Sequence, residues 1–324
     1  MSYDVRITEL AWCRPSFNGA HRWRNTPIGA WVTSLMYRSI LWCMVSTTPK
    51  ARALGAELRQ ARERAGVGMR ELARRLEISH SVLSRIESGE RPPRPEDVAS
   101  ILTALGVHGQ AQEAVLDLSR DTGGSHWLSV GMPELDRQLA ALLDFERTAS
   151  HIIDVSPLLI PGLLQTSEYV HAIMTAAGLP SHEVEMRSAM RLGRREVLRT
   201  RNPVRLTAYI GEFVLYQKIV NAAAMRDQLK FIVELAEQPH VTVHIIPTAT
   251  GWHPGLEGTF SLLEFSAAPP IVHLETRRSG LFLGEGDDVD AYRTAIDKVR
   301  EVAMSPADST RLIADAIKEM ETTL

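Results

Sequence analysis

The sequence predicts a mainly α N-terminal domain of four to five helices with a helix-turn-helix, followed by an α+β domain with a mixed sheet. Between residues 51 and 105, apolar residues recur at three- and four-residue spacing and glycines interrupt the pattern. Beyond residue 203, short β-branched segments alternate with turns. The composition, 44% hydrophobic and 23% charged over 324 residues, is typical of a globular protein with two domains.

The N-terminal helices follow from this spacing. Leu54 and Ala61 share one face of a first helix, which Gly66 ends because glycine favours a turn. A second short helix follows, and Ser79 then suits the N-cap of a third helix, since its hydroxyl can accept a backbone N–H. A tight turn between the second and third helices predicts a helix-turn-helix domain over residues 49–120.

Two runs of residues in this domain form a motif with specific spacing. They are Glu71-Leu72-Ala73 and Ser84-Arg85-Ile86-Glu87-Ser88-Gly89. In this order they resemble the DNA-binding domain of the Xre (Cro/C1-type) repressors. The resemblance implies a transcriptional regulator that binds double-stranded operator DNA as a homodimer, on half-sites about one helical turn apart.

The local charge agrees with DNA binding. Residues 51–95 hold ten arginines and six glutamates, an excess of four positive charges in a chain of net charge −3. Arginine suits bidentate contacts with phosphate and guanine. The alternative, a helical bundle with a solvated basic face, explains the charge but not the motif.

Position in the domain predicts the role of each side chain. The residues expected to contact bases, at the start of the third helix, are His80, Ser81, Ser84 and Arg85. The residues expected to contact phosphates are Arg70, Arg91 and Arg94. The resemblance also implies that Glu87 forms a structural ion pair with an arginine of the first helix, here Arg62. Loss of one partner would leave the other as a partly buried, unpaired charge.

Residues 1–48 carry four of the six tryptophans and both cysteines, without a clear period. We expect a non-native leader, with translation starting near Met44, or else a disordered extension. Arg38 interrupts the apolar stretch at 28–45, which makes it a poor membrane span.

Two cysteines provide no disulfide framework or zinc site, so we expect a cytoplasmic protein without metal or cofactor.

A polar linker is predicted over 121–132, and the α+β domain over 133–324. Helices are expected near 135–149, 166–178, 181–199, 222–237, 288–303 and 309–322, with an extended apolar segment at 155–164. Strands are expected at 204–210, 241–247, 259–265, 271–275 and 280–284. The helix between the first two strands permits a parallel crossover, whereas the later strands favour hairpins.

The order of several segments in this domain is informative. These are IPGLLQT (160–166), VHIIP (243–247), GTFSLLEF (258–265) and VHLE (272–275). Together they resemble the C-terminal domain of actinobacterial Xre regulators, antitoxin-like transcriptional regulators that include the WhiJ-type developmental proteins. The resemblance implies a small partner protein encoded nearby, or a ligand. Where that family usually has Ile-Asp-Glu, this chain has Ile210-Gly211-Glu212, so any role of the aspartate is lost here.

Catalysis in the second domain would require the histidines and glutamates scattered there: His240, His244, His253, His273, Glu212, Glu264 and Glu275. On a strand, His273 and Glu275 point to one face and could hold a metal or exchange protons. No catalytic signature supports this, so we predict that the chain is not an enzyme. The arginines at 187–199 suggest either a second nucleic-acid surface or, more simply, a solvated helix.

Overall fold

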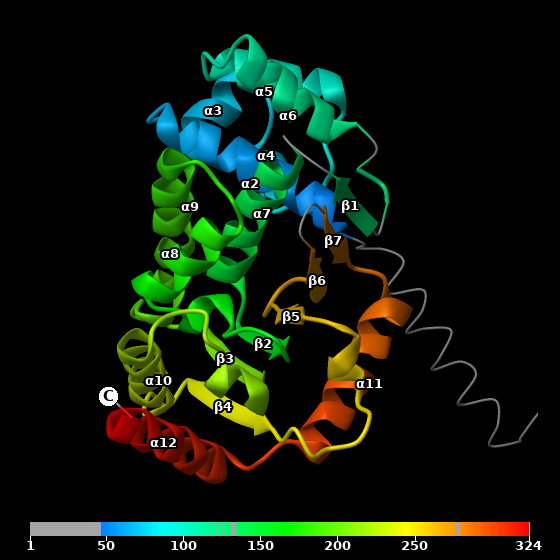
Figure 1. Cartoon of the computed structure of the whole chain (residues 1–324). Helices are drawn as coiled ribbons and strands as arrows, with labels where there is room; N and C mark the ends of the chain where they lie inside the picture. The colour runs from blue at the N-terminus through cyan, green and yellow to red at the C-terminus, as the bar shows by residue number, and fades with distance from the viewer. Residues whose placement is uncertain (1–46, 121, 125, 131–133, 277–278, 324) are drawn as a thin grey trace, which may run out of the picture. The chain divides into compact units, whose positions relative to one another are not determined.

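The computed structural model describes residues 47–120, 122–124, 126–130, 134–276 and 279–323 (Figure 1). The predicted leader and start site therefore lie outside the described residues, except for Thr47 and Thr48. Both threonines are buried, and Thr48 caps the first described helix by accepting the Ala51 N–H at 3.1 Å. The folded domain thus includes two residues that were predicted to belong to the leader. Every described helix is too short or too polar to cross a membrane.

Five described helices form the helix-turn-helix part, within the predicted number of four to five. They are α2 (Pro49–Arg64), α3 (Met69–Arg75), α4 (His80–Glu87), α5 (Pro95–Ala104) and α6 (Gln110–Ser119). The core between them contains Leu54, Leu72 and Leu83, all fully buried. Ser79 is the N-cap of α4, accepting the Val82 N–H at 3.2 Å. Gly89 ends α4 at φ 77°, a conformation that glycine adopts without strain.

The C-terminal part contains a mixed seven-stranded sheet in the order β1-β7-β6-β5-β2-β3-β4. Its strands are β1 (His126–Val130), β2 (His151–Ser156), β3 (Arg205–Gly211), β4 (Val241–Ile246), β5 (Phe260–Glu264), β6 (Ile271–Glu275) and β7 (Ser279–Leu283). The predicted parallel crossover joins β3 and β4, and β2 is also parallel to β3. The later strands pair antiparallel, as predicted.

Two strands were not predicted. β1 lies inside the predicted linker and pairs with β7, so that His126 faces Leu283. β2 begins directly after a helix, in a segment expected to be extended only from residue 155. Both strands are short and pair with residues far away in the sequence. The spacing of apolar residues within a short segment does not predict such long-range pairing.

Helices cover both faces of the sheet. They are α7 (Glu134–Thr148), α8 (Ser167–Ala176), α9 (Ser181–Gly193), α10 (Ala222–Ala236), α11 (Gly286–Val302) and α12 (Pro306–Thr323), with 3-10 turns η1 (Gly162–Leu164), η2 (Arg194–Leu198), η3 (Glu212–Tyr216) and η4 (Pro254–Glu257). The sheet separates two apolar cores, and successive side chains of β2 point into opposite ones. Ile152 packs with α7 and α10, whereas Ile153 packs with α11. Figure 1 shows α8 and α9 side by side and α11 apart from them.

Candidate nucleic-acid interface and a cavity beside the sheet

Helix α4 presents a polar face to solvent. Leu83, Ile86 and Glu87 point inward, whereas the four residues predicted to contact bases are exposed: His80, Ser81, Ser84 and Arg85. The helical period places these four together on the turns opposite the buried residues. An exposed polar face on the second helix of a helix-turn-helix is the surface that enters a major groove.

The residues predicted to contact phosphate flank this face. Arg70 is in the first turn of α3, while Arg91 and Arg94 are in the loop between α4 and α5, and all three are exposed. Backbone bonds fix the loop: the Arg91 N–H donates to the Arg85 carbonyl at 2.9 Å, and the Arg94 N–H to Asp97 Oδ2 at 3.1 Å.

Charge pairing distinguishes two sets of arginines in the domain. Arg74 and Arg75 both bind Glu71 within α3. By contrast, no carboxylate of the described residues pairs with Arg70, Arg85, Arg91 or Arg94. The arginines predicted to contact DNA are therefore available to an anionic ligand at the exposed face of α4.

The implied ion pair between Arg62 and Glu87 is present. Arg62 Nε donates to Glu87 Oε1 at 2.7 Å and Nη2 donates to Oε2 at 2.8 Å, and the two side chains are 11% and 3% exposed. The hydrogen bonds that Arg62 donates to Glu87 raise the pKa of Arg62. This bidentate pair joins α2 to α4 and fixes the orientation of the exposed face.

A cavity of about 780 Å³ lies in the C-terminal part, between the sheet and helices α8 and α9. Six ionisable side chains line it, from strand β2, from α9 and the turn after it, and from strand β6: Asp154, Arg187, Arg191, Arg194, His273 and Glu275. Most of the remaining wall is apolar. This gathering of charged side chains is the second candidate site of the molecule.

The electrostatics of the cavity are set by burial. Arg194 binds Glu146 through two hydrogen bonds of 3.0 and 2.6 Å. Burial raises the pKa of Asp154 to about 7, and its Oδ1 has no hydrogen-bond partner among the described residues. Burial lowers the pKa of His273 to about 4, and its ring stacks on Phe282 at 4.6 Å. His273 is consequently neutral at pH 7.

The arginines of α9 and of the turn after it have two kinds of surroundings. Arg187 pairs with Glu183 at 3.2 Å, as predicted for a solvated helix. Arg187, Arg191 and Arg194 also line the cavity, and the Arg195 guanidinium lies 5.2 Å from the centre of the Phe231 ring. The density of arginines is visible in the sequence, but the side on which each lies depends on how α9 and its following turn pack.

Comparison with known proteins identifies both parts. The family model described as a domain of unknown function (DUF5753) matches residues 139–315, more than half of the chain. The chain belongs to this family. A model described as a helix-turn-helix domain matches residues 53–116. No curated protein matches the chain. One matching solved structure is that of the clp gene regulator ClgR from C. glutamicum, 35% identical, with 23% of this chain and 94% of that chain covered and a TM-score of 0.20.

Within the DUF5753 domain, the structure does not assemble the candidate histidines into one site. His240 and His244 bond to the carbonyls of Leu198 and Met304 at 3.0 and 2.8 Å. His253 is buried. Only His273 and Glu275 share the cavity, as their positions on one strand predicted.

Among the described residues, one group of three could hold a cation, although the sequence predicted no metal site. His126, Glu285 and Asp288 have ligand atoms within 4.8 Å of one another. They come from β1 and from the start of α11, in the acidic stretch at 284–288. The group lies at the surface, and His126 Nε2 already bonds to Asp288 Oδ2 at 2.6 Å.

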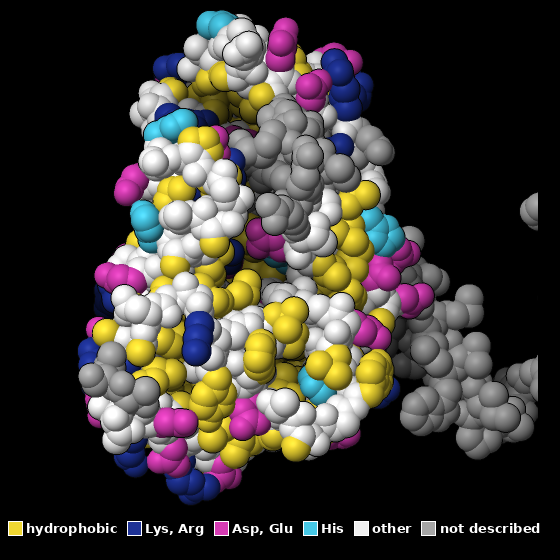
Figure 2. Space-filling view, in the orientation of Figure 1, with side chains coloured by type: hydrophobic (Ala, Val, Ile, Leu, Met, Phe, Trp, Pro, Cys, Tyr) yellow, Lys and Arg dark blue, Asp and Glu magenta, His cyan; other side chains and the backbone are white. Residues whose placement is uncertain are grey.

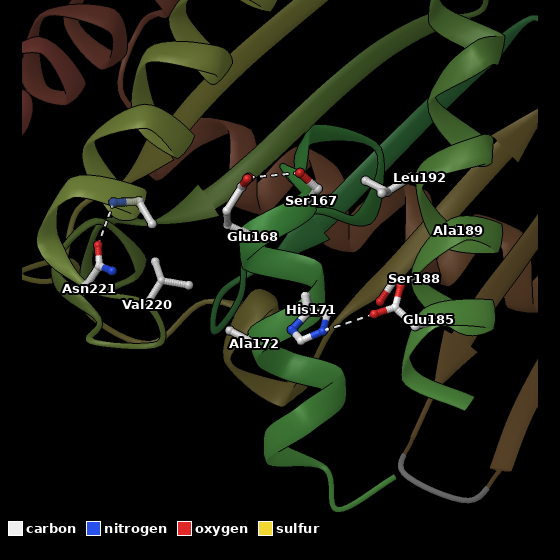
Figure 3. Close-up of a pocket in the computed structure, with 11 residues that line it drawn as sticks. Ser167, Glu168, His171, Ala172, Glu185, Ser188, Ala189, Leu192, Val220 and Asn221 are labelled. Atoms are coloured by element: carbon white, nitrogen blue, oxygen red, sulfur yellow. Dashed lines mark hydrogen bonds and ion pairs between the residues drawn. The ribbon is translucent and has the colours of Figure 1, made fainter. Parts of the chain in front are cut away.

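A second cavity of about 610 Å³ lies between α8, α9 and the start of α10 (Figure 3). Most of its polar side chains bond to near neighbours. Ser167 donates to Glu168 at 2.9 Å, His171 lies 3.7 Å from Glu185, and Asn221 caps α10. Only the buried Ser188 hydroxyl has no partner among the described residues. This cavity therefore offers a ligand fewer unpaired polar groups than the one beside the sheet.

Proposed function

We propose that the chain is a sequence-specific DNA-binding transcriptional regulator whose DUF5753 domain modulates DNA binding. The observation that carries this proposal is the exposed polar face of α4, surrounded by arginines that no carboxylate pairs with, in a segment that matches a helix-turn-helix domain. Such a face supplies base contacts from α4 and phosphate contacts from its surroundings. The proposal assigns the chain no catalytic activity.

The finer features of the proposal rest on the sequence motifs. We infer an Xre-type domain acting as a homodimer in the cytoplasm, because one helix-turn-helix offers few base contacts and two half-sites double them. His80, Ser81, Ser84 and Arg85 would read bases, while the three flanking arginines would add affinity that falls with salt.

A small partner protein is favoured by a hydrophobic surface. Large apolar side chains are exposed in the loops after the parallel strands β2, β3 and β4: Leu158, Leu159, Phe213, Tyr216, Trp252 and Leu256. The carboxyl ends of adjacent parallel strands meet at one edge of a sheet, so these loops are neighbours. Figure 2 shows hydrophobic side chains collected over β3 and β4. Contiguous exposed apolar surface is typical of protein interaction sites.

The same surface supports the alternative function, an antitoxin-like module. In that case the DUF5753 domain sequesters a small partner, and DNA binding serves autoregulation. Toxicity of the neighbouring small gene when expressed alone would favour this alternative, whereas a harmless neighbour would favour modulation.

Genome-wide immunoprecipitation of the tagged full chain tests the proposed function. We expect discrete peaks that share an inverted repeat and that disappear in an Arg85→Ala variant. The matched control is Arg201→Ala, which removes an exposed arginine of the DUF5753 domain and should leave the peaks unchanged. Absence of peaks from the wild-type chain would contradict the proposal. Repeating the experiment without the neighbouring gene then separates control by a partner from control by a ligand.

A further inference from the structure

The cavity beside the sheet contains buried polar atoms without hydrogen-bond partners. Asp154 is 9% exposed and its Oδ1 has no partner among the described residues. Gln165 is 2% exposed; its Nε2 donates to the Ile160 carbonyl at 2.6 Å, but its Oε1 is also unpartnered. A buried acceptor that loses water without gaining a donor costs about 1–3 kcal/mol. A molecule in the cavity that supplies a donor would offset this cost.

The fixed charges around the cavity balance. Arg187 pairs with Glu183, and Arg194 pairs with Glu146. Glu275, also in the lining, acts favourably on the charge of Arg191. Three arginines thus face three glutamates, and burial raises the pKa of Asp154 to about 7, so its carboxyl group is mainly protonated below that pH. A charged group that enters this cavity would lose its hydration and would find no unpaired opposite charge, so its burial would cost free energy.

The rest of the wall suits an apolar molecule. It includes Leu159, Ile160, Ile173, Met174, Leu179 and Phe260. A volume of about 780 Å³ lies within the range of about 300–1,000 Å³ that small-molecule sites occupy. Apolar walls with a few converging polar groups are the usual composition of such sites.

We propose that this cavity binds an uncharged, largely apolar small molecule whose hydroxyl group donates a hydrogen bond to Gln165 Oε1 and accepts one from Arg191. The apolar body lies against the side chains of α8 and of the segment after β2. The hydroxyl satisfies an orphaned acceptor, and the Arg191 guanidinium, which has no ion pair within 4 Å among the described residues, supplies the donor.

Helix α7 links this cavity to the helix-turn-helix. Leu139 lines the cavity, and Glu146 holds Arg194. Between them on the same helix, Asp144 pairs with Arg59 of α2. A molecule that displaces Arg194 therefore acts on a helix that contacts the DNA-binding domain directly. This extension of the inference, that occupancy of the cavity changes operator affinity, rests on the proposed function.

Four probes of equal chain length test the ligand class on the purified full chain. Calorimetry compares decanol with decyl methyl ether, decanoate and decylamine. We expect decanol to bind at one site, and each of the others to bind about tenfold more weakly, equivalent to about 1.4 kcal/mol. Tighter binding of decanoate or decylamine would overturn the neutral class. Equal binding of the ether would overturn the role of the hydroxyl, and failure of decanol to bind would overturn the site.

A second experiment tests whether decanol binds in this cavity. Gln165→Leu should weaken decanol binding about tenfold, whereas Arg201→Ala should leave it unchanged. Because Gln165→Leu also removes a buried hydrogen bond, nuclear Overhauser contacts between decanol and the Met174 methyl group of the wild-type chain provide a test that needs no variant. Unweakened binding by a folded Gln165→Leu chain, or absence of these contacts, would place decanol elsewhere.

The last measurement is operator affinity with and without saturating decanol. We expect a change of at least about fivefold, the lower end of ordinary coupling between sites. Unchanged affinity would overturn the coupling through α7. A chain that binds decanol but no DNA would refute the proposed function and leave the site intact. A chain that binds its operator but not decanol would refute the ligand site and leave the proposed function intact.

Discussion

Arginines in this chain fall into two groups that differ in whether a carboxylate lies within reach. Arg62 and Arg194 each form a buried bidentate pair, with Glu87 and Glu146. The arginines around the exposed face of α4 have no such pair among the described residues. A paired arginine contributes mainly to structure, whereas an unpaired exposed arginine remains available to an anionic partner.

This difference gives a prediction for two arginines near α4. Arg85→Ala should cost about 1–3 kcal/mol on the specific operator and relax its sequence preference, because a base contact is lost. Arg94→Ala should weaken all DNA sequences alike and reduce the slope of log affinity against log salt by about one. Fluorescence anisotropy with operator and random duplexes over a salt series measures both. Equal weakening on random DNA would remove Arg85 from the base-reading set, and an unchanged slope would remove Arg94 from the phosphate set.

Asp154 gives a prediction about pH. Its pKa rises from 3.8 to about 7 on burial, so between these values the folded state binds more protons than the unfolded state. The free energy of unfolding therefore falls as pH rises through this window, with a slope of at most about 1.4 kcal/mol per pH unit. Asp154→Asn removes the ionisation and should increase the free energy of unfolding more near about pH 8 than near about pH 5. Urea unfolding at both pH values measures this, and an equal effect at both would show that Asp154 titrates normally.

At the scale of elements, close approach between segments explains a residue that the sequence only marked as unusual. Gly211 ends β3, and a Cβ added there would lie 2.3 Å from the Pro157 carbonyl oxygen. The aspartate that the resembled family has at this position would meet the same obstacle. The glycine is therefore required by the segment after β2, which also forms part of the cavity wall.

Gly211→Ala should consequently reduce the free energy of unfolding by about 1–3 kcal/mol, the usual cost of forcing extra volume into a packed site. Gly251→Ala is the matched control, since a Cβ there meets nothing within 4 Å, and should change stability by less than about 0.5 kcal/mol. Chemical unfolding compares the two variants. If both behave alike, the backbone after β2 can move away without cost.

At the scale of the whole described unit, the helix-turn-helix and the sheet share contacts that join them. The Arg52 guanidinium of α2 lies 3.7 Å from the centre of the Phe265 ring and donates to the Pro269 carbonyl at 3.3 Å. The apolar cores of the two parts form one continuous cluster. Strand β1 continues the sheet directly after the DNA-binding helices, so the predicted linker at 121–132 includes a structural element.

We therefore expect the two parts to unfold together. Native-state hydrogen exchange should give α3 and β3 the same opening free energy in the wild-type chain. Arg52→Ala should lower protection in α3 more than in β3, because it removes the contacts that join the parts. Arg64→Ala, which removes an exposed arginine from the same helix, should lower neither. Separate opening energies in the wild-type chain would mean that the parts fold independently.

The sequence by itself determined the helix-turn-helix, the mixed sheet, and the positions of the exposed polar side chains on α4. These features depend on local rules: helical period, an N-cap serine, and the alternation of short β-branched strands. Local spacing was also sufficient to place His273 and Glu275 on one face of β6.

Only the tertiary structure decided where β1 and β2 pair, which arginines of α9 and its following turn face the cavity, and why residue 211 is glycine. Each depends on segments that are distant in the sequence. The burial that raises the pKa of Asp154 and leaves its Oδ1 without a donor is likewise produced by the packing of β2 against β3 and β5 and of helices beside them. Hydrogen-bond satisfaction and desolvation are properties of a three-dimensional surrounding, and sequence spacing does not encode them.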